Sequence, residues 1–278
     1  MTDPHHTDLK HDAIAAEVLD AADAGRQIAP FSERLAAAFA MPDAYAVTAA
    51  VRRRREDRGE RPVGRKIGFT NRTIWDTYGV HAPIWGYMYD STVRELADCA
   101  GGVDLASLQE PRIEPEIAFG LAAAPQPDMD EAALLGCVAW VAHGFEIVQS
   151  LYPGWRFAAA DTVAGFGMHG AYVIGPRRPV AEAPDEGWLE ALAAFQIVLR
   201  RDGEVAGRGA AANVLGGPLS ALRHLVELLA DDAHNPPLAA GEVVTTGTLT
   251  DAFPVAPGET WHTELDGLPL DGIEVRLR

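Results

Sequence analysis

The chain has 278 residues, of which 48% are hydrophobic and 23% are charged, values typical of soluble globular proteins. Its 23 Lys and Arg against 40 Asp and Glu give a formal net charge of −17, which argues against nucleic acid or an anionic membrane as a partner. The cysteines Cys99 and Cys137 lack metal-site spacing, and the sequence contains no signal peptide or membrane-spanning run. We therefore expect a cytoplasmic protein.

Helical patterns dominate the first part of the chain. Apolar residues recur at helical spacing over residues 9–24, and further helices are expected to begin near Ser32 and Met41. The following sequence changes to short β-branched runs punctuated by glycine. We predict an α+β protein with a helical N-terminal portion, residues 1–60, and a β-rich catalytic body, residues 61–278.

Strand-like runs alternate with helical patterns in the body. Helices are expected at about residues 130–135, 188–194 and 219–229. Strands are expected at about residues 61–70, 112–120, 139–142, 171–175, 197–200, 243–246 and 273–277. Glycine motifs for binding nucleotides are missing from the sequence, so a nucleotide fold is not expected.

Residues 112–120 contain two acidic side chains in a strand-like, apolar run. Because side chains alternate along a strand, Arg112, Glu114 and Glu116 share one face, with the two glutamates about 7 Å apart along the backbone. Like charges on an apolar face need a shared proton, an arginine or a divalent cation to neutralise them. The alternative is a solvent-exposed edge strand, since Pro115 is tolerated at sheet edges.

Three other features extend this acidic strand into a candidate site. Lys66 lies in an apolar, glycine-flanked run, where it either reaches solvent or meets a counter-charge. Glu146 is another acid in an apolar strand, and the segment 245–250 offers hydroxyls and amides for a carboxylate or forms a tight turn. Together they predict Mg²⁺ or Mn²⁺ bound by Glu114, Glu116 and Glu146, with positions left for water or substrate.

The motifs also occur in a characteristic order. They are Gly64-Arg65-Lys66-Ile67-Gly68-Phe69-Thr70, Tyr78-Gly79-Val80, Pro83 and Gly86, Glu114-Pro115-Glu116, Glu146-Ile147-Val148, Asp161-Thr162-Val163-Ala164, Gly247-Thr248-Leu249-Thr250 and Pro254-Val255-Ala256-Pro257-Gly258. In this order the chain, from about Ile28 onward, resembles the 2-keto-4-pentenoate hydratase and 4-oxalocrotonate decarboxylase family of the fumarylacetoacetate hydrolase-like superfamily.

The resemblance implies a mixed β-roll body, a divalent metal on the three glutamates and Lys66 at the active-site lysine. The implied substrates are small 2-oxo or 2-hydroxydienoic acids. We also expect a homo-oligomer, which in this family can form a complex with another enzyme of its pathway.

Two segments depart from the family pattern. In Pro83-Ile84-Trp85-Gly86, Ile84 stands where these hydratases commonly have an acid. After Asp161-Thr162-Val163-Ala164 the family often continues with Asp-Asn, whereas residues 165–170 here read Gly-Phe-Gly-Met-His-Gly. Five residues are predicted to bind substrate because they lie within or next to these motifs in the sequence: Arg72, Trp85, Phe166, His169 and Thr248. As a lone histidine, His169 is equally well explained by a structural role.

The expected reaction is hydration of a 2-hydroxy-2,4-dienoate, through its 2-oxo-4-enoate form, to a 4-hydroxy-2-oxo acid. Decarboxylation of a 2-oxo-3-enedioate of the 4-oxalocrotonate type is the first alternative. Hydrolysis of a C–C bond in an acylpyruvate is the second, and a hydrogen bond from His169 to a carboxylate beside the metal would favour it. A non-enzymatic subunit that binds small acids is the third.

Overall fold

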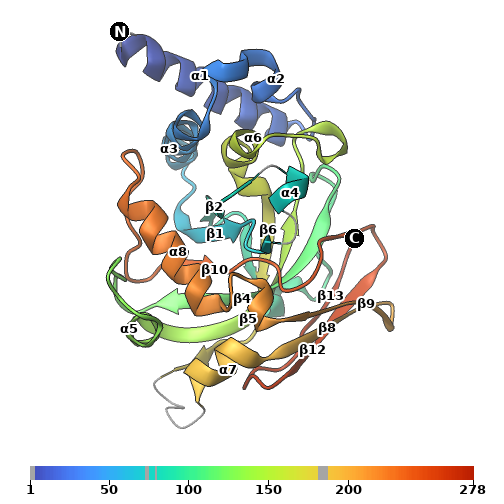
Figure 1. Ribbon diagram of the computed structural model, residues 1–278. Helices are drawn as coiled ribbons and strands as arrows, with labels where there is room; N and C mark the ends of the chain where they lie inside the picture. Colours follow the sequence, from blue (N-terminus) through green and yellow to red (C-terminus); the bar gives the residue numbers. More distant parts are fainter. Residues whose placement is uncertain (1–3, 73–74, 79, 181–186) are drawn as a thin grey trace.

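The computed structural model describes residues 4–72, 75–78, 80–180 and 187–278, and Gly79 of the second motif lies outside them. Helices α1 (Pro4–Asp23), α2 (Phe31–Leu35) and α3 (Met41–Asp57) gather at one end of the molecule together with α6 (Ala159–Ala164) (Figure 1). The three expected N-terminal helices are confirmed, although α1 begins earlier than its apolar pattern.

The body contains a mixed sheet whose hydrogen-bonded order is β2-β1-β10-β4-β5-β6-β3, with β11 on β4 and β7 on β5. Pairing is parallel in β1–β10 and β3–β6 and antiparallel elsewhere in this sheet. Its strands are β1 (Pro62–Gly68), β2 (Ile84–Tyr89), β3 (Val93–Glu95), β4 (Arg112–Leu121), β5 (Val138–Val148), β6 (His169–Ile174), β7 (Arg178–Pro179), β10 (Val243–Thr245) and β11 (Phe253–Pro254).

A second sheet has the order β13-β12-β8-β9. Its strands are β8 (Gln196–Arg201), β9 (Glu204–Ala210), β12 (Thr260–Asp266) and β13 (Glu274–Arg276). The remaining α-helices are α4 (Trp75–Tyr78), α5 (Glu131–Gly136), α7 (Trp188–Ala194) and α8 (Pro218–Ala230). Short 3₁₀ turns cover Ala36–Ala38, Leu96–Cys99, Pro153–Trp155, Phe166–Met168 and Ala211–Asn213. None of the described helices is both long and apolar enough to cross a membrane.

Strand β4 lies inside the main sheet, so the edge-strand interpretation is wrong. It pairs with β5 on one side and with β10 and β11 on the other. Pro115 falls between the stretches that pair with β10 and β11, and its carbonyl accepts a hydrogen bond from the Leu249 amide at 2.9 Å. Proline is therefore tolerated because its missing N–H falls at a gap in the ladder.

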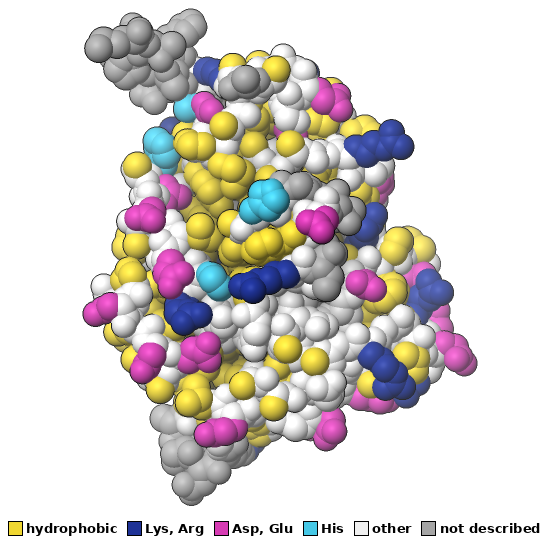
Figure 2. All heavy atoms as spheres, viewed as in Figure 1, with side chains coloured by type: hydrophobic (Ala, Val, Ile, Leu, Met, Phe, Trp, Pro, Cys, Tyr) yellow, Lys and Arg dark blue, Asp and Glu magenta, His cyan; other side chains and the backbone are white. Residues whose placement is uncertain are grey.

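Two apolar clusters hold the main sheet against its helices. Leu222 and Leu225 of α8 pack with Ile117 and Phe119 of β4 in the larger cluster. The other cluster joins α1 and α3 to α6, for example through Leu19 and Val163. Figure 2 shows acidic and basic side chains interspersed over the visible face of the molecule. The protein is therefore a curled mixed sheet joined to helices that the N-terminal part of the chain forms, as expected for the α+β class.

Candidate metal centre

Three glutamates converge on one face of the main sheet. Glu114 and Glu116 are two residues apart on β4, and Glu146 is the cross-strand partner of Glu114 on β5. One carboxylate oxygen from each of these residues lies within 4.8 Å of the others. Strand alternation and antiparallel register together produce this cluster.

The partners of the buried carboxylate oxygens indicate how a cation would fit. The Gly247 amide donates a 2.9 Å hydrogen bond to Oε2 of Glu116, whereas Oε1 of Glu116 is buried without a hydrogen-bond partner among the described residues. Oε2 of Glu146 also lacks a hydrogen-bond partner in this part of the chain and is ion-paired with Lys66. Buried oxygens of this kind suit a hard divalent cation, so the residues fit the predicted Mg²⁺ or Mn²⁺ site.

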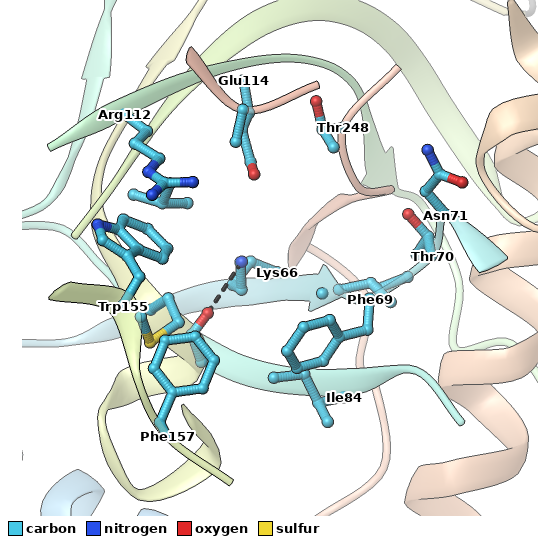
Figure 3. Close-up of a pocket in the computed structure, with 16 residues that line it drawn as sticks. Lys66, Phe69, Thr70, Asn71, Ile84, Arg112, Glu114, Trp155, Phe157 and Thr248 are labelled. Carbon is cyan, nitrogen blue, oxygen red and sulfur yellow. Dashed lines mark hydrogen bonds between the residues drawn. The ribbon is translucent and has the colours of Figure 1, made fainter. Parts of the chain in front are cut away.

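Lys66 approaches the cluster from β1. Its side chain is 3% exposed, and Nζ lies 3.1 Å from Oε2 of Glu146. Nζ also donates a 2.9 Å hydrogen bond to the carbonyl of Gly167, which has a left-handed backbone with φ of 62° (Figure 3). The lysine therefore meets a counter-charge instead of reaching solvent.

The four ionisable groups of the cluster cannot all carry a charge and remain balanced unless a cation binds. Burial, reinforced by Glu146, raises the pKa of Glu114 to about 7 and that of Glu116 well above its usual value. Burial would also raise the pKa of Glu146, but Lys66 and His169 outweigh it and the pKa falls. Without a cation, protons on Glu114 and Glu116 therefore offset much of the charge. When all three carboxylates are ionised, the one ammonium leaves two negative charges, which a divalent cation would neutralise.

The charge state of Lys66 differs from what a catalytic base needs. Burial lowers its pKa, but the nearby Glu146, Glu114 and Glu116 outweigh burial, and the pKa lies above its usual value. A proton shuttle near neutral pH requires the opposite shift. In the metal-free protein Lys66 is therefore an ammonium that can orient an anion or donate a proton.

A pocket with a volume of about 90 Å³ opens beside Lys66 and Glu114. Figure 3 shows Arg112 and Thr248 at its polar side and the rings of Phe69 and Phe157 at its apolar side. The Arg112 guanidinium stacks over the Trp155 ring at 4.1 Å. The other lining residues are Ile67, Gly68, Thr70, Asn71, Ile84, Val148, Gly167, Met168 and Ala252.

The five substrate-binding candidates lie in different places. Thr248 lines the pocket. Trp85 is fully buried and stacks on Tyr45 at 5.3 Å between ring centroids, because it follows Ile84 and points to the opposite face of β2. Phe166 packs in the cluster of N-terminal helices, and Arg72 is exposed with its guanidinium over Trp75. The geometry thus brings Thr248 alone of these four to the pocket.

Several residues that line the pocket were not among the predicted site residues. Strand alternation placed Arg112 on the face of Glu114 and Glu116, but it was not predicted to bind substrate. Trp155 and Phe157 follow the end of β5 and gave no comparable signal. Non-glycine residues with positive φ also gather here, namely Phe69, Trp155 and Met168. Such backbone strain is common at functional sites.

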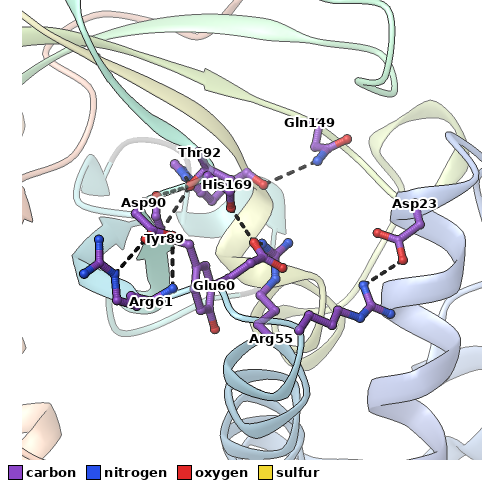
Figure 4. A network of polar contacts seen from close by, with 11 residues as sticks. Asp23, Arg55, Glu60, Arg61, Tyr89, Asp90, Thr92, Gln149 and His169 are labelled. Atoms are coloured by element: carbon purple, nitrogen blue, oxygen red, sulfur yellow. Dashed lines mark hydrogen bonds and ion pairs between the residues drawn. The ribbon is translucent and has the colours of Figure 1, made fainter.

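His169, the fifth candidate, lies behind the glutamates rather than in the pocket wall. Its Nδ1 is 2.8 Å from Oε1 of Glu146. Its Nε2 is 2.9 Å from Oγ1 of Thr92 (Figure 4). The histidine–carboxylate pair that would favour a hydrolase is therefore present. Both ring nitrogens are engaged, however, and burial lowers the pKa of His169, so the ring offers the pocket no free nitrogen.

Comparison with known proteins identifies the family of this chain. A family model described as the C-terminal domain of fumarylacetoacetate hydrolase matches residues 91–272. The chain belongs to the fumarylacetoacetate hydrolase family. Within this family it is 35% identical to 2-hydroxyhexa-2,4-dienoate hydratase of Comamonas testosteroni, over 81% of this chain and 83% of that protein. It is 34% identical to 4-oxalocrotonate decarboxylase of Pseudomonas putida, over 81% and 82%.

Solved structures in the fumarylacetoacetate hydrolase family show the same fold. The 4-oxalocrotonate decarboxylase of Pseudomonas putida G7, complexed with magnesium and adipate, has a TM-score of 0.86 and 28% identity over 97% of each chain. A fumarylpyruvate hydrolase from Pseudomonas aeruginosa, in complex with Mn²⁺ and pyruvate, has a TM-score of 0.51 and 16% identity. These relatives are enzymes, and the two solved structures each contain a divalent metal.

Proposed function

We propose that the protein is a metal-dependent lyase that hydrates a 2-hydroxy-2,4-dienoate, through its 2-oxo-4-enoate form, to a 4-hydroxy-2-oxo acid. The observation that carries the proposal is the cluster of Glu114, Glu116 and Glu146 beside Lys66 and a pocket. Mg²⁺ or Mn²⁺ is the expected ion, because the cluster offers only carboxylate oxygens. The names of the hydratase relatives support the substrate class.

The bound cation would supply a Lewis acid that polarises the 2-oxo acid. The residues of the chain would position the substrate. The Lys66 ammonium, fixed by the Gly167 carbonyl and Glu146, is placed to orient the substrate carboxylate and to donate a proton. The rings that line the pocket exclude water from the hydrocarbon part of the substrate.

Decarboxylation of a 2-oxo-3-enedioate is the second candidate function. The high structural similarity to a 4-oxalocrotonate decarboxylase favours it. Ile84 favours it too, because this apolar side chain in the pocket wall cannot activate a water molecule. Acylpyruvate hydrolysis has less support, since the nitrogens of His169 face Glu146 and Thr92.

The first test measures ion binding and substrate-like binding separately. Metal-stripped protein is melted with Mg²⁺ or Mn²⁺, with and without oxalate, a planar mimic of the enolate of a 2-oxo acid. Oxalate should stabilise the protein only when the metal is present, and ligand at about 100 times its Kd adds about 2.7 kcal/mol. Glu114→Gln should remove this response. A melt that neither metal nor oxalate shifts would contradict the proposal.

A second test separates the effect of Lys66 on turnover from its effect on metal binding. Lys66→Met should reduce turnover of a 2-hydroxydienoate strongly while the protein still binds Mg²⁺, because the lysine is not among the carboxylate ligands. Turnover equal to that of the unmodified protein would remove Lys66 from the mechanism. Products assayed with a 2-hydroxydienoate and with a 2-oxo-3-enedioate then decide between hydration and decarboxylation.

We also propose that the protein assembles as a homo-oligomer. The oligomer would act on a small 2-oxo acid and could associate with another enzyme of its pathway. Size-exclusion chromatography with light scattering measures the oligomeric state directly.

A further inference from the structure

His169 occupies a position that the proposed chemistry leaves unexplained. It begins β6, is 4% exposed, and lies on the side of Glu146 remote from the pocket. Its two ring nitrogens connect a carboxylate of the metal cluster to Thr92 in the turn between β2 and β3. Figure 4 shows the half of this connection that joins His169 to Thr92.

The hydrogen-bond partners determine which nitrogen carries the proton. An ionised carboxylate can only accept, so Nδ1 of His169 donates to Oε1 of Glu146. Nε2 then accepts from the hydroxyl of Thr92, whose oxygen in turn accepts from the Tyr89 amide at 3.1 Å. The Tyr89 carbonyl, also 3.1 Å from this hydroxyl, keeps the Thr92 amide as its donor at 2.9 Å. Every member of this chain is satisfied by one tautomer of a neutral ring.

The consequence for Glu146 is a fixed orientation. Oε1 is occupied by His169, while Oε2 lies 3.1 Å from Nζ of Lys66 and is buried without a hydrogen-bond partner among the described residues. If the imidazole were absent, the carboxylate could rotate and offer both oxygens to the lysine. Partners that hold a ligand in this way commonly change metal affinity by about 10–100-fold.

We propose that His169 is a positioning residue, fixed by Thr92, that holds Glu146 so that Oε2 faces the divalent-cation site. The inference rests on the proposed metal cluster and adds two residues to it, His169 and Thr92. It assigns no proton transfer to the ring. It also explains why the histidine–carboxylate pair can exist in this protein without acting as a hydrolytic base.

Two amide substitutions separate the functions of the two ring nitrogens. The amide of Asn can take the place of Nδ1, so His169→Asn should keep the bond to Glu146 and lose the one to Thr92. The amide of Gln reaches the place of Nε2, so His169→Gln should keep Thr92 and lose Glu146. The two variants are matched in chemistry and differ in which partner they retain.

The readout is the dissociation constant for Mn²⁺, measured by calorimetry, together with the electron paramagnetic resonance spectrum of the bound ion. We expect His169→Gln, which loses the contact with Glu146, to bind about 10–100-fold more weakly than the unmodified protein. His169→Asn, which loses only the anchor at Thr92, should weaken binding less, to the same extent as Thr92→Val. Equal affinities in the two variants would overturn the inference. The inference would also be overturned if His169→Gln retained full Mn²⁺ affinity but lost turnover, because the ring would then act as a catalytic base.

A second pair of variants keeps the test valid if changes at His169 prevent folding. Thr92→Ser retains the hydroxyl and should retain Mn²⁺ affinity, whereas Thr92→Val frees the ring and should weaken binding. Identical affinities would again overturn the inference. If the unmodified protein binds neither Mg²⁺ nor Mn²⁺, the proposed function fails as well, so the two failures are distinguishable.

Discussion

At the residue scale, burial changes the ionisation of Glu114. Its carboxyl is ordinarily half-ionised at pH 4.5, and burial in the folded protein moves the pKa to about 7. The folded state therefore holds a proton that the unfolded state has released between these two values. Stability from this group is full below about pH 4.5 and is lost as the pH rises through about 7.

This raised pKa predicts a pH dependence of stability. In metal-free protein, the free energy of unfolding should fall between pH 5 and pH 8 more steeply than it does in Glu114→Gln, which cannot ionise. Urea unfolding at a series of pH values measures both slopes. Added Mg²⁺ should reduce the fall, because metal binding strengthens as the carboxylates lose their protons. Parallel curves for the two proteins would show that Glu114 does not titrate in this range.

At the element scale, the turn after β10 holds the carboxylate of Glu116, one of the proposed metal ligands. Gly247 has φ of 92°, and its amide donates to Oε2 of Glu116. A Cβ atom at this position would lie 1.9 Å from Oγ1 of Thr70. The turn therefore requires glycine for its conformation and for the close approach of another segment.

Gly247→Ala should destabilise the protein by more than the roughly 1–2 kcal/mol of a left-handed residue, and it should also weaken Mg²⁺ binding. Gly258→Ala is the matched control, because its φ is 97° and an added Cβ would have no atom of the described residues within 4 Å. Urea unfolding and calorimetric titration compare the two variants. Equal losses of stability and unchanged metal binding would show that the contact with Thr70 is unimportant.

Sequence patterns predicted most elements but only part of the site. Alternation along a strand was sufficient to bring Glu114 and Glu116 to one face, and the spacing of apolar residues indicated α8. The same alternation, applied to Ile84 and Trp85, would have placed Trp85 in the core. Strand order and the short helix α6 could not be predicted, because they depend on pairing between distant segments.

At the scale of the whole molecule, helix α6 connects the N-terminal helices to the residues around the glutamate cluster. Leu19 of α1 is 1% exposed in the cluster that includes Val163 of α6, and the segment after α6 carries Gly167 and His169. The boundary near residue 60 marks a change from helix to strand. The shared cluster argues that both parts unfold together.

Leu19→Ala should lower the free energy of unfolding by about 2–5 kcal/mol, the usual cost of a cavity in a core. The variant and the unmodified protein should each unfold in a single transition, with far-UV and near-UV circular dichroism changing at the same temperature. Loss of helix at a lower temperature, with the metal-dependent transition unchanged, would instead establish residues 1–60 as a separate domain.

The pairing of β4 with β5 has one more consequence. All three glutamates lie on two neighbouring strands, whereas Lys66, Gly247 and His169 come from three other segments. The proposed cation ligands and the groups that would hold them in place are thus encoded in separate stretches of the chain. Substitutions can therefore change the surrounding segments while strands β4 and β5 keep the three glutamates. This separation suits a family whose members include both a hydratase and a decarboxylase.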